Sequence, residues 1–374
     1  MGPLNGIRII EFAGIGPGPF AAMMLADMGA EIIRIERPGA PSPTAESFVL
    51  RGRKTVALDL KRPEAAAAAR RLVASSDALI EGFRPGVMER LGLGPDTCLA
   101  DNRALVYGRM TGWGQDGPLA RAAGHDVNYI ALSGALWSMG EAERDPMPPL
   151  NLVGDFGGGG MLLAFGIACA LLRARATGEG DVVDAAICDG TAALMAPLYA
   201  SMAQGMWVNE RGANRLDGSA PYYGVYRCKD GAWVCLAPIE PQFWALFLDL
   251  LGLPAEDYAD REDKTRWPVW RDRFAEIFAT KSREEWRQVF EGTDVCFAPV
   301  LDMEEAPRHP HNAARGVFED RGGVIQPAPA PRFREASTGW PSAPDAEGTD
   351  AVAALQACGF ETSEIERLKA DGVI

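Results

Sequence analysis

Short apolar runs alternate with helical segments through the first half of the chain, and this alternation constrains the fold most. Residues 7–12 (IRIIEF) and 32–35 are predicted to be buried strands, and residues 20–28 between them have helical composition. The pattern continues with predicted strands at 55–60, 78–81, 105–109 and 182–187 and predicted helices at 63–75, 125–136 and 160–175. Parallel strands need a crossover connection, which is usually a helix. We therefore expect an α/β protein whose large domain is Rossmann-like, with a doubly wound parallel sheet.

A second pattern begins near residue 205. Residues 207–221 are polar and glycine-rich, which predicts a linker, and residues 222–236 contain a Lys-Asp-Gly turn between two short strands, typical of a β-hairpin. Helices are expected at 242–251, 269–279 and 284–290. We expect a large domain at 1–200, completed by 330–374, a smaller α+β domain at 222–318, and linkers at 201–221 and 319–329.

Charge and cysteine content exclude several classes of partner. The formal net charge of −14 argues against nucleic acid or an anionic membrane as the main partner. The seven cysteines are odd in number and contain no CxxC pair, which favours reduced thiols in a cytoplasmic protein and gives no support for a zinc site. No signal peptide is expected, and the apolar run at 157–172 is shorter than the roughly 20 residues that span a bilayer. We expect a cytoplasmic protein with no membrane span and no bound metal.

The turn after the first predicted strand, residues 14–19 (GIGPGP), partly matches a dinucleotide-binding loop. Glu36 follows at the distance of a ribose-binding acid. However, Pro19 stands where that motif has its third glycine, and Pro17 and Pro19 lack the N–H groups that such a loop directs at pyrophosphate. Nicotinamide or flavin binding is therefore disfavoured against a purely structural tight turn.

Basic residues gather between residues 34 and 62, where seven of them face three acidic ones for a net charge of +4. They are Arg34, Arg37, Arg51, Arg53, Lys54, Lys61 and Arg62, and Arg84 and Arg90 follow. Several come directly after predicted strands, where open α/β sheets bind ligands, and guanidinium groups match phosphate oxygens. The cluster suits a ligand with several phosphates, such as coenzyme A, and by charge alone it fits a solvated surface equally well.

Three residues are candidates for acid–base chemistry, and each has a structural alternative. His125 stands at a predicted helix start and fits a structural histidine. Asp155 precedes four glycines and fits a helix N-cap, and Glu240 precedes a proline and fits a turn. His309 and His311 lie in a predicted loop without further metal ligands nearby.

Long segments of the chain resemble the family III CoA-transferase superfamily and, within it, the α-methylacyl-CoA racemases. These segments are residues 14–39, 81–95, 110–134, 148–161, 182–190, 211–226, 237–244 and the tail 359–374. The resemblance implies a Rossmann-like large domain, a small domain and an interlocked homodimer, with each active site between the large domain of one chain and the small domain of the other. It places CoA on the large domain, at Ile15, Arg37, Leu58, Lys61 and Arg84.

The resemblance also implies how the candidates act. His125, paired with Glu240, serves one face of the acyl-CoA substrate and Asp155 the other. Inversion at C2 of an acyl thioester removes a proton from one face and returns one to the opposite face, so two acid–base groups suffice, and no cofactor is expected beyond the CoA of the substrate. The N–H of Asp126 is expected to stabilise the enolate oxygen, and Gly157–Gly160 allow close backbone approach.

The principal alternative is a CoA transferase, in which Asp126 would be the nucleophile that carries the acyl group. The His125–Glu240 pair favours the racemase, because such transferases typically lack it. The same residues with Asp155 oppose a third class, a non-catalytic CoA-binding protein. Branched fatty, sterol-derived and aryl-propionyl acyl groups all remain compatible with the sequence.

Overall fold

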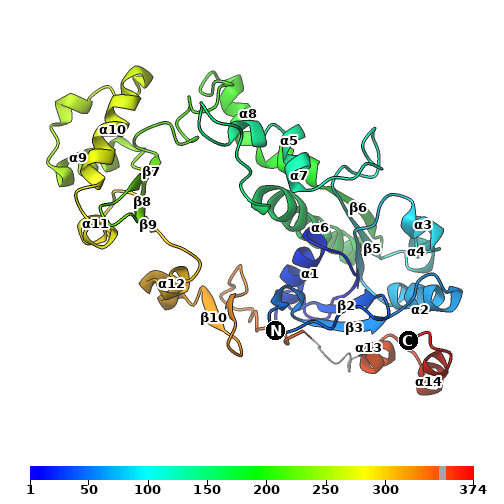
Figure 1. The fold of residues 1–374 in the computed structure, drawn as a ribbon. Helices are drawn as coiled ribbons and strands as arrows, with labels where there is room; N and C mark the ends of the chain where they lie inside the picture. The colour runs from blue at the N-terminus through cyan, green and yellow to red at the C-terminus, as the bar shows by residue number, and fades with distance from the viewer. Residues whose placement is uncertain (345–350) are drawn as a thin grey trace. The chain divides into compact units, whose positions relative to one another are not determined.

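The computed structural model describes residues 1–344 and 351–374, which form two compact units (Figure 1). The first unit comprises Met1–Ala135, Pro149–Ala196 and Gly316–Ile374. The second comprises Leu136–Pro148 and Pro197–Arg315. The expected large domain included residues 136–148, and here they belong to the second unit. Residues 345–350, part of the expected C-terminal completion, lie outside the described residues.

A six-stranded parallel sheet forms the centre of the first unit, in the order β3-β2-β1-β4-β5-β6. The strands are β1 (Arg8–Phe12), β2 (Glu31–Glu36), β3 (Arg53–Ala57), β4 (Ala78–Glu81), β5 (Val106–Thr111) and β6 (Asp181–Ala186). Strand order reverses between β1 and β4, which is where doubly wound sheets bind ligands. The Rossmann-like α/β fold expected from the sequence is confirmed.

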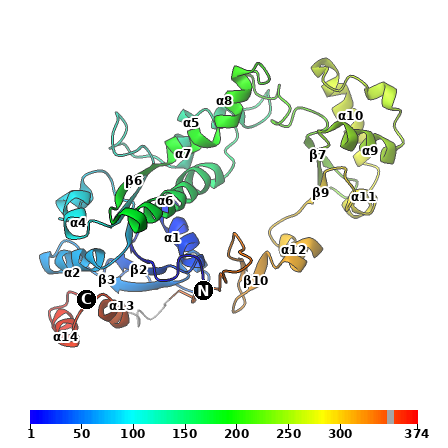
Figure 2. The same cartoon turned by 180° about the vertical axis from the view of Figure 1, so that it is seen from behind.

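Helices cover both faces of this sheet (Figures 1 and 2). They are α1 (Pro17–Asp27), α2 (Pro63–Ala74), α3 (Val87–Arg90), α4 (Pro95–Asp101), α5 (Asp126–Leu132), α6 (Leu162–Thr177), α7 (Ile187–Leu194), α13 (Ala351–Ala357) and α14 (Thr362–Ala370). Side chains alternate along β1, so that Ile10 packs with α2, α13 and α14 while Ile9 packs with α1 and α6. The last helices thus complete the core of the first unit.

A ten-residue π-helix, Leu152–Met161, runs directly into α6. Among the described residues, the stretch Leu152–Thr177 is long and apolar enough to cross a membrane, judged by length and composition alone. In its most apolar 18-residue segment, 44% is buried inside the protein. Core helices of soluble proteins meet the same criterion. In this protein, α6 packs against β5 and β6 of the sheet.

The second unit has an antiparallel sheet of β7 (Gly224–Arg227), β8 (Trp233–Leu236) and β9 (Phe297–Val300), in which β7 and β8 form the expected hairpin. Its helices are α9 (Pro241–Leu251), α10 (Trp267–Phe278), α11 (Arg283–Phe290), α12 (Pro310–Arg315) and most of α8 (Ala196–Ala203). An aromatic core joins α9, α10 and α11 to the sheet, with Phe274 packed against Trp244 and Phe247. The short strands β10 (Phe318–Asp320) and β11 (Ile325–Pro327) belong to the first unit.

Residues 207–221, expected as a linker, form an ordered loop of the second unit. The buried side chain of Asn214 accepts from the N–H of Val208 and donates to the carbonyl groups of Val208 and Glu210. Arg211 donates to the carbonyl groups of Glu141 and Arg144, which ties residues 136–148 to the same loop. The polar composition that resembled a linker supplies these hydrogen bonds.

Candidate active site

The five residues predicted to bind CoA gather at the carboxyl ends of the strands. Ile15 follows β1 and is 85% exposed, Arg37 directly follows β2, and Leu58 and Lys61 follow β3, while Arg84 follows β4. Because these four strands are parallel neighbours, their carboxyl ends lie along one edge of the sheet. The side chain of Leu58 is buried in the core and its N–H donates to the carbonyl of Glu36 at 2.8 Å, so contact of Leu58 with a ligand stays a prediction.

Bonding to other groups of the protein separates the basic cluster into two groups. Arg34 and Arg53 both bind the buried carboxylate of Glu11, at 2.7 and 2.9 Å, and Arg51 binds Asp27. Lys54 pairs with Glu31, and Arg62 donates to the carbonyl groups of Asp371 and Gly372. Arg37, Lys61 and Arg84 are exposed, and the ion pairs found among the described residues do not include them. Arg90 is likewise exposed and outside these ion pairs, so the three predicted CoA-binding cations are among the four basic side chains of this cluster that remain available for a ligand.

A buried acid supports the loop that carries Arg84. Glu81 ends β4, accepts from the N–H of Phe83 at 2.7 Å and pairs with Arg109 at 2.9 Å. Burial raises the pKa of Glu81, while the bond from Phe83 and the charge of Arg109 oppose that rise. Glu81 therefore couples the Arg84 loop to the neighbouring strand β5.

Asp155 lies inside the π-helix, not at its N-cap, so the N-cap interpretation is wrong. The N-cap is Asn151, whose side-chain Nδ2 donates to Asp155 Oδ2 at 3.2 Å. The same carboxyl faces Gly16, in the turn between β1 and α1, because a Cβ built on Gly16 would lie 3.6 Å from Asp155 Oδ2. Asp155 is thus half-buried at the carboxyl edge of the sheet, next to the loop of Ile15.

The glycines after Asp155 allow the π-helix to pack between two other helices. A Cβ on Gly158 would lie 2.6 Å from Thr191 Oγ1 on α7, and one on Gly160 would lie 2.8 Å from the carbonyl oxygen of Pro17 on α1. On the α7 side, a Cβ on Gly190 would lie 1.8 Å from the carbonyl oxygen of Gly158. These contacts leave no space for side chains, which explains the glycine run.

His125 caps the start of α5 in extended conformation and is exposed. Its N–H donates to Asn128 Oδ1 at 3.0 Å, which fixes the first turn of that helix. The next residue, Asp126, is buried, and its Oδ1 accepts the N–H of Asp155 at 2.7 Å. This bond joins the segment of His125 to that of Asp155, so the structure brings these two candidates into one region.

Glu240 belongs to the second unit, where it is exposed at the N-cap position of α9. Burial raises the pKa of the nearby Cys296, and the charge of Glu240 adds to the rise. Since His125 is in the first unit, its pairing with Glu240 rests on the family resemblance and stays a prediction.

The remaining histidines, His309 and His311, belong to the second unit. His311 is in α12 rather than a loop, and His309 Nε2 lies 2.9 Å from Glu291 Oε1. In the described part of the chain, no group of three or more His, Cys, Asp or Glu residues is arranged to hold a metal.

Asn151 is not among the candidate residues named from the sequence, and Gly16 appears there only within the turn at residues 14–19, but both lie against the Asp155 carboxyl. The spacing of Asn151 and Asp155, four apart before a helical run, would have indicated that their side chains meet.

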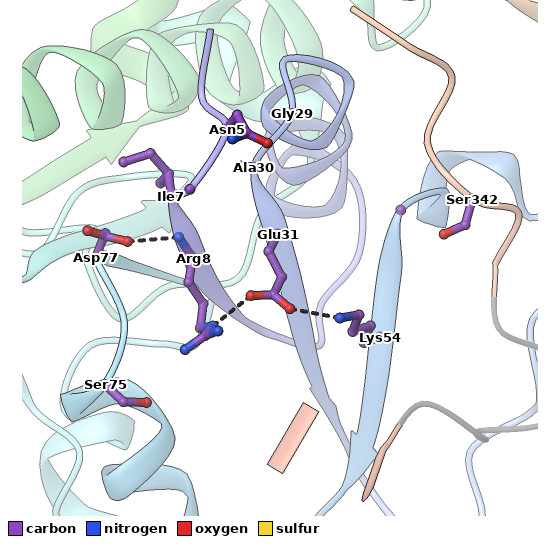
Figure 3. A pocket seen from close by; sticks show the side chains of 12 residues that line it. Asn5, Ile7, Arg8, Gly29, Ala30, Glu31, Lys54, Ser75, Asp77 and Ser342 are labelled. Carbon is purple, nitrogen blue, oxygen red and sulfur yellow. Dashed lines mark hydrogen bonds and ion pairs between the residues drawn. The ribbon is translucent and has the colours of Figure 1, made fainter. Parts of the chain in front are cut away.

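A polar pocket of about 500 Å³ lies at the opposite, amino edge of the sheet (Figure 3). Arg8 and Lys54 both bind Glu31, at 2.7 and 2.8 Å, and Asp77 accepts from the N–H of Arg8. The charged groups satisfy one another, so this pocket favours no ligand of either sign.

Comparison with known proteins agrees with this architecture. Residues 4–350 match the model of CoA-transferase family III, and the chain belongs to this family. Among solved structures, a CaiB/BaiF family protein from Brucella suis superposes with a TM-score of 0.80 at 24% identity, over 96% of this chain and 99% of that one.

Within the family, the chain is 44% identical to the α-methylacyl-CoA racemase of Mus musculus and 42% identical to that of Homo sapiens. Each match covers 99% of this chain and 97% of the relative. It is 31% identical to the acetyl-CoA:oxalate CoA-transferase of Acetobacter aceti, over 87% of this chain and 88% of that one.

Proposed function

We propose that this protein is a racemase that inverts C2 of 2-methylacyl-CoA thioesters. The observation that carries the proposal is the similarity to α-methylacyl-CoA racemases, at 42–44% identity over nearly the full chain, against 31% for the transferase from Acetobacter aceti. The arrangement of Asp155 and His125 supports it chemically.

The reaction is a proton transfer from one face of C2 to the other. His125, assisted by Glu240, and Asp155 serve as the two acid–base groups, one beginning protonated and the other not. When one group removes the C2 proton, an enolate forms, and the other group donates a proton to the opposite face. The hydrogen bond from Asp155 N–H to Asp126 supports this assignment, because it holds the two segments together. The mechanism uses no cofactor.

The enolate needs a donor for the negative charge on the thioester oxygen. The N–H of Asp126 suits this role, because it opens α5 and the first N–H groups of a helix have no acceptor within it. Arg37, Lys61 and Arg84 supply positive charge for the phosphates of CoA at the carboxyl edge of the sheet.

The burial of Asp126 argues against the alternative, a CoA transferase. The residue is only 8% exposed and one carboxyl oxygen already accepts the N–H of Asp155, whereas a nucleophile must reach the thioester carbon. We also propose a homodimer and a cytoplasmic location, on the family resemblance and the cysteine content respectively.

The test supplies one stereoisomer of a 2-methylacyl-CoA together with an excess of a different free carboxylic acid. We expect optical purity to fall while CoA stays on its original acyl group. Movement of CoA to the free acid, with the original stereoisomer intact, would show a transferase instead.

A further inference from the structure

The side chain of Asp126 has a role that the proposed reaction leaves open, since that reaction uses only its N–H. Asp126 is buried, with 8% of the residue exposed, and its Oδ1 accepts the N–H of Asp155 at 2.7 Å. Its Oδ2 is buried as well and has no hydrogen-bond partner among the described residues. Burying a carboxyl costs free energy unless hydrogen bonds or a paired charge compensate for the lost water.

The π-helix creates a need for this carboxyl. In a π-helix an N–H donates five residues back, and the first such bond here runs from Phe156 to the carbonyl of Asn151, at 3.3 Å. The N–H of Asp155 comes one residue too early to find an acceptor within the helix. Asp126 provides that acceptor from α5, across 29 residues of chain.

The contact is closely fitted on the side of the π-helix. A Cβ on Gly154 would lie 2.2 Å from Asp126 Oδ1 and 2.9 Å from Ile130 Cγ2, so only glycine admits the carboxyl here. Burial raises the pKa of Asp126, and the negative charge of Asp155 adds to the rise. The bond survives either charge state, because a neutral carboxyl still accepts through its carbonyl oxygen.

We propose that the Asp126 carboxyl is a positioning residue that fixes the backbone of Asp155 and thereby aims the Asp155 carboxyl at one face of C2. The inference rests on the proposed racemase function. It predicts that loss of the Asp126 carboxyl impairs proton transfer at one face of C2 only, because only the face served by Asp155 depends on Asp126. His125 keeps its own cap through Asn128, which does not involve the Asp126 carboxyl.

The experiment follows exchange of the C2 proton in deuterated water, starting separately from each stereoisomer. In Asp155→Ala, the stereoisomer whose proton faces His125 still exchanges with retained configuration, because His125 can remove a proton and return deuterium to the same face. Asp126→Ala should behave in the same way as Asp155→Ala. We expect racemisation to fall on the order of 10²-fold, since a displacement of about 1 Å has effects of this size. Exchange should persist from the same stereoisomer that Asp155→Ala retains.

Two further variants separate positioning from loss of stability. Asp126→Asn keeps an oxygen acceptor and should recover racemisation to within about tenfold of wild type. Tyr107→Phe removes another buried bond from a side chain to a backbone carbonyl, that of Leu93 at 2.8 Å, and should lower the Tm while both stereoisomers exchange and racemise as in wild type.

Equal loss of exchange from both stereoisomers in Asp126→Ala would overturn the inference, and so would an Asp126→Asn variant as inactive as Asp126→Ala. Neither result touches the proposed function, which fails only if the wild-type protein itself does not racemise the substrate.

Discussion

At the scale of single residues, burial and internal bonding decide which basic side chains serve the fold and which can serve a ligand. Arg53 is 2% exposed and shares the carboxylate of Glu11 with Arg34. It also donates to the carbonyl of Pro19 in α1. Arg37 and Arg84 are exposed on loops after β2 and β4.

This difference predicts that substitution of a buried arginine lowers stability, whereas substitution of an exposed one weakens substrate binding. Arg53→Met should lower the free energy of unfolding by about 3–5 kcal/mol, because it leaves a buried carboxylate with one partner fewer. Arg84→Ala should change it by less than about 0.5 kcal/mol and should raise KM for the acyl-CoA. Urea denaturation and steady-state kinetics measure the two effects. If Arg84→Ala unfolds the protein or leaves KM unchanged, the assignment of Arg84 to CoA is wrong.

The cysteines give a second test at this scale. Burial raises the pKa of both Cys98 and Cys228 to about 11, whereas Cys169 and Cys296 are exposed. Thiolates are the reactive form, so at pH 8 an alkylating reagent should modify Cys169 first and Cys98 and Cys228 last, with rates that rise with pH. Peptide mass spectrometry identifies the modified sites. After unfolding without reductant, all seven thiols should react, and fewer would reveal a disulfide.

At the scale of elements, the strands could be predicted from the sequence and the π-helix could not. Apolar runs such as residues 7–12 and 78–81 are long enough only for buried strands, and the observed bounds of β1 and β4 agree closely. The π-helix depends on close packing against α1 and α7, which contact Gly160 and Gly158 and lie far away in the sequence. Local composition around Asp155 therefore suggested an ordinary N-cap. Residues 207–221 form a loop rather than the expected linker for a related reason. Their polar groups form hydrogen bonds with one another, and polar composition alone does not show this.

The contact between α7 and the π-helix predicts a destabilising substitution. Gly190→Ala would place a Cβ 1.8 Å from the carbonyl oxygen of Gly158, so one of the two helices must move. We expect unfolding to become easier by about 1–3 kcal/mol, as for other overpacked sites, and racemisation to decrease with the displacement of Asp155. Gly339→Ala is the control, because a Cβ there meets nothing within 4 Å. Equal stability of the two variants, measured by denaturation, would contradict the tight contact.

At the scale of the whole molecule, the candidate residues are divided between two units. His125 and Asp155 lie in the first unit and Glu240 in the second, which accords with the family resemblance that motivates the proposed homodimer. The fold class could be predicted from the sequence, and so could the gathering of the candidate residues at the carboxyl edge of the sheet, because strand ends in a parallel sheet converge; the binding of CoA at this edge stays a prediction. The partner of His125 could not be derived in this way, since no local pattern links residues 125 and 240.

Subunit mixing tests the shared-site proposal. His125→Ala and Glu240→Ala should each lose most activity, but when the two are unfolded and refolded together, half of the dimers contain both variants and one intact site each. The mixture should recover about a quarter of wild-type activity. Each variant refolded alone is the control. No recovery in a mixture that forms dimers would place both residues of a site on the same chain.

The central claim is that His125 and Asp155 serve opposite faces of C2. The most direct measurement incubates His125→Ala and Asp155→Ala separately with each stereoisomer of a 2-methylacyl-CoA in deuterated water and follows deuterium at C2. We expect neither variant to racemise, and we expect each to exchange one stereoisomer with retained configuration, a different stereoisomer for each variant. Exchange of the same stereoisomer by both variants, or racemisation by either, would contradict the account.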